Sequence, residues 1–346
     1  MRLMKSCKMI AGPVSAPTSS RLLLLLLLLS VSFAQETTVR SRSNLVLVPT
    51  LVKDQQGSIV YGLESKDFII EDNGVEQSAR LDEAPEAQPL SLVVAIQRGR
   101  RASYEFSRMK GLRTMLSPLF VSGTAQVAIV EFDSHVDLSR NFTSDEALID
   151  ADLSNLQAGD DGAAILDAIA YSIKLLSAQP DNRLRVLLLI SETRDHGSHA
   201  KIEQTVAAVG QANAMMYSLA FSPGLSNILD TGRGMNTPLN PNATNEMHPT
   251  IDFIDLAYRT AQAMRKNVPS TVASMTGGEY ELFATRKKFE VRMNDFTNHL
   301  HNRYLLSFAP KEPAPGLHHL QVRLKDPANG IVLARTSYWA EEQGKN

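Results

Sequence analysis

The sequence predicts an α/β fold in which a doubly wound, mostly parallel sheet is accompanied by a small β-sandwich formed from N- and C-terminal strands. Continuous apolar runs recur between residues 90 and 220, as in strands that are buried on both faces of a parallel sheet. Segments with the apolar spacing of helices lie between these runs. Strand-like alternation is found before and after this region, and each end has too few such segments for a stable sheet of its own.

The apolar runs predict the strands of the parallel sheet at residues 92–96, 127–130, 186–190 and 216–220, with a short strand at 280–283. Helices are expected over residues 106–119, 165–176, 202–209, 251–266 and 288–302. Strands that alternate with helices imply right-handed crossovers and therefore a doubly wound sheet. Residues 222–250 are rich in Gly, Asn, Pro and Thr, and we expect them to form a long surface loop.

The sandwich is expected to have one half at each end of the chain. The N-terminal half, residues 35–84, has strand patterns at 45–50, 59–61 and 68–70. The C-terminal half, residues 303–340, has them at 304–308, 320–324 and 331–334. The α/β domain, residues 90–302, would then be an insertion between the two halves.

Residues 1–34 have the pattern of a secretory signal peptide. The basic residues come first: Arg2, Lys5, Lys8 and Arg21. A leucine run at 22–29 follows, and then the small residues Ser32 and Ala34. The apolar stretch is shorter than the ~20 residues of a spanning helix. We therefore expect cleavage after Ala34, a periplasmic or secreted protein, and no membrane span in the mature chain; an uncleaved anchor is the alternative.

Composition argues against nucleic-acid binding and against cysteine-based chemistry in the exported chain. Removal of residues 1–34 leaves 31 basic and 37 acidic residues, a net charge of −6, which argues against a nucleic-acid partner. The single cysteine, Cys7, lies in the removed segment. The mature chain would therefore have no disulfide, no thiol nucleophile and no thiolate metal ligand.

Several short stretches follow one another in a recognisable order. They are V-K-D-Q-Q-G at 52–57, G-L-E-S-K-D-F at 62–68, I-V-E-F-D at 129–133, L-D-A-I at 166–169, A-S-M-T-G-G at 273–278, R-Y-L-L-S-F-A-P at 303–310 and A-R-T-S-Y at 334–338. Together they resemble VWFA-related proteins of the acidobacterial type, in which a von Willebrand factor A-like domain is flanked by β-strand regions. Leu166 stands where the family has Tyr.

The resemblance implies one divalent cation, bound by Asp-x-Ser-x-Ser after the first strand, a Thr before the third helix and an Asp after the fourth strand. In this chain the five positions hold Gln97, Gly99, Arg101, Ala163 and Glu192. Gly99 and Ala163 have no side-chain oxygen, and Arg101 can only donate. We therefore expect a degenerate site with no metal and no cofactor.

Three arrangements of this degenerate site are possible. In the first, the guanidinium of Arg98, Arg100 or Arg101 takes the place of the ion and pairs with Glu192 or Asp161. In the second, Gln97 and the acidic residues Asp133, Asp160, Asp161, Asp195 and Glu192 form a remodelled, weak cation site, and adhesion remains cation-dependent. In the third, the arginines lie in a solvated loop, which also predicts no metal.

We expect a non-enzymatic protein-interaction or adhesion-type module that binds another protein without a divalent cation. Ligands of open α/β sheets bind at the carboxyl ends of the strands. The expected contact face therefore consists of Gln97, Arg98, Gly99, Arg100, Arg101, Asp160, Asp161, Glu192 and Asp195. A secreted hydrolase is a further alternative. The Gly-x-Ser-x-Gly motif is missing, and although Ser191, His196 and Ser198 lie close in sequence, loop residues of these types are common. The pairs His299/His301 and His318/His319 are expected at the surface.

Overall fold

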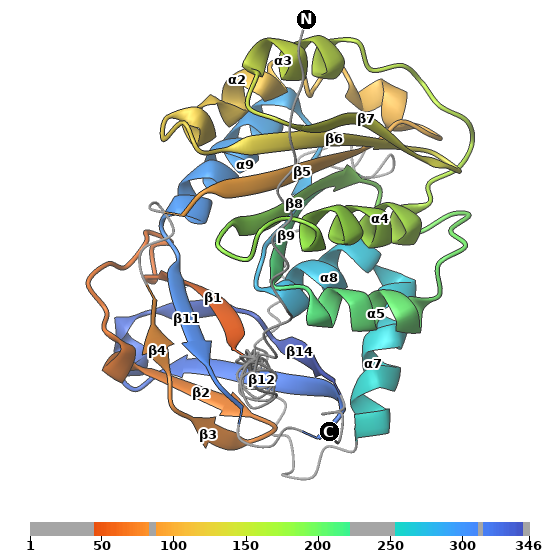
Figure 1. The fold of residues 1–346 in the computed structure, drawn as a ribbon. Coiled ribbons are helices and arrows are strands. Elements are labelled where there is room, and N and C mark those ends of the chain that lie inside the picture. The colour runs from red at the N-terminus through yellow and green to blue at the C-terminus, as the bar shows by residue number, and fades with distance from the viewer. Residues whose placement is uncertain (1–44, 83–87, 222–252, 311–313, 342–346) are drawn as a thin grey trace, which may run out of the picture. The chain divides into compact units, whose positions relative to one another are not determined.

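The computed structural model describes residues 45–82, 88–221, 253–310 and 314–341, which form three sheets and the helices around them (Figure 1). The expected signal peptide and the expected loop at 222–250 lie outside the described residues. No helix within the described ranges is long and apolar enough to cross a membrane.

The first sheet has six strands and is mostly parallel. In pairing order they are β10 (Tyr280–Phe283), β9 (Ala214–Phe221), β8 (Leu184–Ser191), β5 (Leu90–Gln97), β6 (Gln126–Phe132) and β7 (Val136–Thr143). Only β7 runs antiparallel to its neighbour, at one edge. The central strand, β5, is buried along its whole length, which explains its unbroken apolar sequence.

Successive side chains of β5 point to opposite faces of this sheet, and each face has its own apolar core. Leu92 and Val94 pack with α2 (Leu112–Leu116), α3 (Glu146–Ser154) and α9 (Arg286–His301). Val93 and Ala95 pack with helices on the other face: α4 (Ile165–Ser177), α5 (Ile202–Gln211), α7 (Phe253–Lys266) and α8 (Val268–Thr276). The sheet is therefore covered by helices on both faces, as Figure 1 shows.

The prediction of a single helix over residues 106–119 is wrong. This region contains α2 between two 3₁₀ turns, Ala102–Glu105 and Ser117–Phe120. Gly111 precedes α2 with a φ of +86°, a conformation that interrupts a right-handed helix. The apolar residues that suggested the helix are nevertheless buried against the sheet: Met109, Leu112, Leu116 and Leu119.

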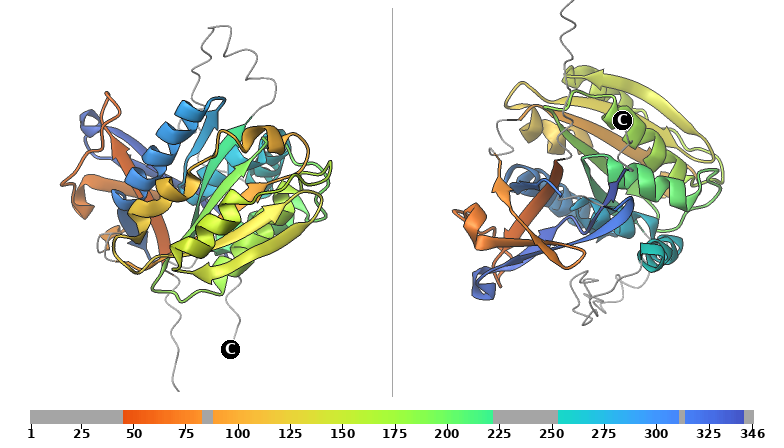
Figure 2. Two further views of the ribbon diagram at one scale, coloured as in Figure 1. Left: turned by 90° about the horizontal axis from the view of Figure 1, so that it is seen from above. Right: turned by 60° about the horizontal axis from the view of Figure 1, so that its bottom comes forward.

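The other two sheets are antiparallel, and each has four strands taken from both ends of the chain. One consists of β13 (Ile331–Ala334), β1 (Val46–Lys53), β11 (Tyr304–Phe308) and β4 (Arg80–Leu81). The other consists of β14 (Ser337–Ala340), β12 (Gly316–Leu324), β2 (Phe68–Asp72) and β3 (Val75–Gln77). Figure 2 shows from two directions that the orange N-terminal strands lie beside the blue C-terminal strands. Their buried residues form one shared apolar core, which includes Val48, Ile70 and Phe308.

The prediction of a strand at residues 59–61 is wrong. Ile59 makes only an isolated bridge with Lys53. Gly57 and Gly62 flank this segment with φ values of +88° and +79°, so the chain turns before and after it.

Two histidines that we expected at the surface are buried, so that prediction is wrong for them. His299 Nδ1 lies 2.9 Å from Glu279 Oε2. His318 Nδ1 lies 2.7 Å from Asp72 Oδ1, and its Nε2 lies 2.7 Å from the carbonyl oxygen of Ala314. A nearby carboxylate offsets the cost of burying an imidazole, and the sequence spacing of the histidines did not reveal these distant partners.

Arg303 is buried at the point where α9 leads into β11. Its guanidinium donates to Tyr217 Oη at 2.6 Å, to the carbonyl of Gly277 at 2.6 Å and to Glu279 Oε1 at 2.7 Å. Glu279 also pairs with Lys53 of β1 at 3.2 Å. The buried charges of Arg303 and Glu279 therefore link the six-stranded sheet to the strands of the sandwich.

Candidate functional site

The carboxyl ends of β5 and β8 meet at one edge of the parallel sheet, where the residues of the expected metal motif are brought together. Gln97 ends β5 with no solvent exposure. Its Oε1 accepts from the backbone N–H of Glu192 at 2.8 Å, and its Nε2 donates to Glu192 Oε1 at 3.2 Å. The oxygen and the nitrogen of the Gln97 amide therefore both bind Glu192, the residue that follows β8.

Arg100 supplies the positive charge next to Glu192. Its Nε lies 3.3 Å from both carboxylate oxygens of Glu192. We expected an arginine to pair with Glu192 or Asp161, and Glu192 is the partner of Arg100. The contact is made by one nitrogen, so the expected fork of two parallel hydrogen bonds is wrong in this detail.

Arg98 occupies a second acidic environment that the sequence did not predict. Its Nε lies 2.9 Å from Asp133 Oδ2, its Nη2 donates to Asp137 Oδ2 at 2.6 Å, and its Nη1 lies 3.8 Å from Glu131. The three carboxylates belong to β6, to β7 and to the turn between these strands. The Arg98 guanidinium thus balances negative charge that would otherwise favour a cation.

The five positions of the metal motif do not fit a divalent cation, which needs about six oxygen ligands in total. Gly99 is packed so closely that a Cβ would lie 2.0 Å from the carbonyl oxygen of Gly162, so a serine cannot be accommodated without a shift of the backbone. Ala163 is fully buried and has no side-chain oxygen. Gln97 and Glu192 already bind each other, and Glu192 also binds Arg100.

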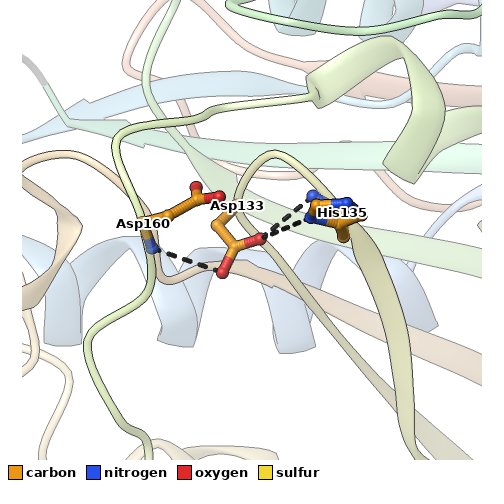
Figure 3. A group of neighbouring side chains, drawn as sticks. All are labelled: Asp133, His135 and Asp160. Carbon is orange, nitrogen blue, oxygen red and sulfur yellow. Dashed lines mark hydrogen bonds and ion pairs between the residues drawn. The ribbon is translucent and has the colours of Figure 1, made fainter.

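A different group of side chains, Asp133, His135 and Asp160, has the residue types of a cation site (Figure 3). Their ligand atoms lie within 4.8 Å of one another. Asp133 Oδ1 accepts from the backbone of His135 at 3.0 Å, and Asp160 Oδ1 accepts from the backbone of Ser134 at 2.9 Å. Hydrogen bonding by the Ser134 hydroxyl is the main reason that the pKa of Asp160 is lowered. A cation here would lie beside the guanidinium of Arg98, which opposes its binding.

The expected contact face is wrong for three of its residues. Gln97, Gly99 and Glu192 are buried, since Gln97 and Glu192 bind each other and Gly99 packs against Gly162 and Asp133. The exposed members are Arg100, Arg101, Asp160 and Asp161, and Arg98 and Asp195 are partly exposed. Asp195 accepts from the backbone N–H of Leu166 at 2.9 Å, in the first turn of α4, so its carboxylate stabilises a helix start.

The residues of the hydrolase alternative are engaged in other contacts. Ser191 donates to the carbonyl of Glu192 at 2.8 Å, and Ser198 donates to Asp195 Oδ1 at 2.6 Å. His196 exchanges backbone hydrogen bonds with Ala163, at 2.8 Å in both directions. This arrangement gives neither serine an activating histidine in the described structure.

No protein family model matches the chain, and no curated protein matches it. Several solved structures match the chain. One is the conserved hypothetical protein BatB from Bacteroides thetaiotaomicron, which is 13% identical over 61% of this chain and 98% of that chain, with a TM-score of 0.40. Another is the vWF domain of the type V pili tip protein Mfa5 from Porphyromonas gingivalis, 13% identical over 31% of this chain and 39% of that chain, with a TM-score of 0.28.

A third similar structure is a mutant form of the PilB minor pilin from Streptococcus sanguinis. It is 11% identical over 74% of this chain and 88% of that chain, with a TM-score of 0.40. TM-scores below 0.5 do not establish a shared fold or a shared function. The chemistry of the site must be argued from the side chains of this chain.

Proposed function

We propose that the chain is an exported, non-enzymatic protein-interaction module of the adhesion type, which binds another protein without a divalent cation. The observation that carries this proposal is the placement of two arginines at the end of the sheet. Arg98 lies among Glu131, Asp133 and Asp137, and Arg100 lies against Glu192. Guanidinium groups thus provide the positive charge that an ion provides in metal-dependent A domains.

Electrostatics makes these arginines incompatible with a tightly bound cation. Two like unit charges about 4 Å apart repel by about 4 kcal/mol at an effective dielectric constant near 20, and a divalent ion doubles this. The ion pairs of Arg98 and Arg100 are also only partly exposed, so salt and water screen them less than surface pairs.

The second candidate is an adhesion module with a remodelled, weak cation site. The group Asp133, His135 and Asp160 is the specific observation in its favour. It predicts that partner binding and stability both depend on a divalent cation. We prefer the first candidate because Asp133 is already paired with Arg98.

Three further parts of the proposal need their own tests. Export is proposed from the signal-peptide pattern and is checked by the N-terminal sequence of the mature protein, expected to begin at Gln35. The absence of enzymatic activity is checked by a broad esterase and peptidase screen, in which turnover would contradict it. The insertion of residues 90–302 between two sandwich halves is checked by limited proteolysis, which should release a stable fragment of about residues 85–300.

Partner capture tests the central part of the proposal. The chain from residue 35 onward would be immobilised and exposed to the exported proteins of its own cell, with EDTA or with Mg²⁺. We expect the same partner to be captured in both conditions, and the double variant Arg100→Glu/Arg101→Glu to capture less of it. The control is Arg323→Glu/Lys325→Glu, which makes the same charge change on the sandwich. Capture that is lost in EDTA, or that the Arg100/Arg101 variant leaves unchanged, would contradict the proposal.

A further inference from the structure

The arginines of the loop after β5 differ in whether their charge is balanced. Arg98 and Arg100 are held by the carboxylates of Asp133, Asp137 and Glu192. Arg101 is exposed, and no hydrogen bond or ion pair of its side chain is found among the described residues. Of the three neighbouring positive charges, that of Arg101 is therefore the one available to a partner.

The backbone just before Arg101 is held by hydrogen bonds to the loop that contains Asp160. Arg100 has a φ of +55°, an uncommon conformation for a residue with a side chain. Its N–H donates to the carbonyl of Asp160 at 2.7 Å, and the N–H of Gly159 donates to the carbonyl of Arg98 at 2.9 Å. Such a preorganised loop loses less conformational entropy on binding than a free loop does.

An exposed aromatic ring lies one turn further along. Tyr104 is 75% exposed, and its N–H donates to the carbonyl of Arg101 at 3.1 Å. Arginine and tyrosine are the residue types that most often dominate the binding energy of protein interfaces. Arg101 and Tyr104 thus present a positive charge and an aromatic ring from the same hydrogen-bonded turn.

We infer that Arg101 and Tyr104 recognise an acidic segment of a partner protein, in which a carboxylate pairs with the guanidinium and an adjacent apolar group packs on the tyrosine ring. The inference rests on the proposed function, because it names the partner chemistry of the same face. A basic partner would have to use Asp160 and Asp161. The hydrogen bonds that Asp160 accepts from Ser134 and Gly162 fix its position but leave its charge, so Asp160 and Asp161 are both competing charges.

Labelled peptides test the inference directly. Three sets of 12-residue peptides, rich in Asp and Glu, in Lys and Arg, or in Ser and Gln, would share the same Leu and Tyr content. Fluorescence anisotropy would measure their binding to the chain from residue 35 onward, in EDTA at low salt. We expect the acidic set to bind at least tenfold more tightly than the neutral set. Since the exported chain has a net charge of −6, non-specific attraction would favour the basic set instead.

Variants locate the binding. Arg101→Glu should lose tenfold or more in affinity for acidic peptides, and Tyr104→Ala about fivefold. Asp161→Lys should leave this affinity unchanged or increase it, and Arg323→Glu, on β12, is the control. Circular dichroism melts should be the same for Arg101→Glu and the original chain. Equal or weaker binding of the acidic set than of the neutral set, or unchanged binding by Arg101→Glu, would overturn the inference.

The two failures can be told apart. If acidic peptides bind only when Mg²⁺ is added, the metal-independent proposed function is wrong. Suppose instead that a partner is still captured in EDTA. If the acidic peptides then bind no more tightly than the neutral ones, or bind Arg101→Glu equally well, only the present inference is wrong.

Discussion

Arg100 Nε lies 3.3 Å from both carboxylate oxygens of Glu192. Glu192 directly follows β8, at the position where the resemblance to VWFA-related proteins implies an aspartate ligand. Gln97, at the end of β5, binds the same carboxylate and the backbone N–H of Glu192. Gln97, Arg100 and Glu192 thus satisfy one another's charges and hydrogen bonds.

The contact between Arg98 and Asp133 should contribute measurably to stability. Arg98→Met leaves the largely buried Asp133 without its counter-charge, and we expect the free energy of unfolding to fall by about 1–3 kcal/mol, less than for a fully buried pair because Arg98 is partly exposed. Arg101→Met is the matched control, with an expected change near zero. Urea denaturation measures both. Equal stability of the two variants would show that the Arg98 pair has no structural role.

Gly99 should resist a return to the serine of the metal motif. A Cβ at this position would lie 2.0 Å from the Gly162 carbonyl oxygen and 2.8 Å from Asp133 Cβ. We expect Gly99→Ser to destabilise the fold by about 2 kcal/mol and to create no cation-dependent stability. Thermal melts with and without Mg²⁺ check both points. A stable Gly99→Ser variant would mean that the loop is less tightly packed than the contacts indicate.

Glu279 should make the protein sensitive to acid. Burial alone would raise its pKa, but hydrogen bonding by His299 and the charges of Arg303, His299 and Lys53 outweigh burial and lower the pKa to about 2. A lowered pKa contributes stability that is present above the ordinary value of about 4.5 and is lost as the pH falls towards 2, amounting to about 3 kcal/mol.

Denaturation at several pH values between 2 and 6 measures this contribution. Glu279→Gln should be less stable at pH 6 and should lose less stability on acidification. Glu290→Gln, which removes an exposed carboxylate of α9, should keep the original pH dependence. If Glu279→Gln retained the full acid-induced loss, the cluster around Arg303 would not be its source.

His318 should give a pH dependence of the opposite sign. Burial alone would lower its pKa, but the hydrogen bonds to Asp72 and to the carbonyl of Ala314, together with the charge of Asp72, raise it. A raised pKa contributes stability that is present below about 6.5 and is lost as the pH rises through the value in the folded protein. His318→Gln should therefore flatten the stability profile above neutral pH, and an unchanged profile would contradict this assignment.

The buried strands were predictable because burial on both faces of a sheet leaves a local mark in the sequence. The run expected at 186–190 lies within β8, and the runs at 92–96 and 127–130 lie within β5 and β6. The helix expected at 165–176 is α4, because one apolar face packs on the sheet. The strand expected at 304–308 coincides with β11.

Elements without an apolar run or an apolar face in their sequence were not predicted. No residue of the edge strand β7 is fully buried, so its sequence carries no continuous apolar run. At the site, the sequence predicts the loss of the metal ligands position by position, and this stays a prediction. The pairing of Arg98 with Asp133 and Asp137, and the burial of Gln97 and Glu192, depend on how distant loops pack, and local sequence does not encode this.

Thermal unfolding of residues 35–346, first in excess EDTA and then with millimolar Mg²⁺, Mn²⁺ or Ca²⁺, tests the central claim most directly. A cation that binds only the folded protein, at about a hundred times its Kd, adds about 2.7 kcal/mol and would clearly raise the melting temperature. The pairing of Arg98 and Arg100 with the acidic residues of the site predicts the same melting temperature in all conditions. A clear rise with one of the cations, removed by Asp133→Asn or Asp160→Asn, would contradict it and establish a cation site at Asp133, His135 and Asp160.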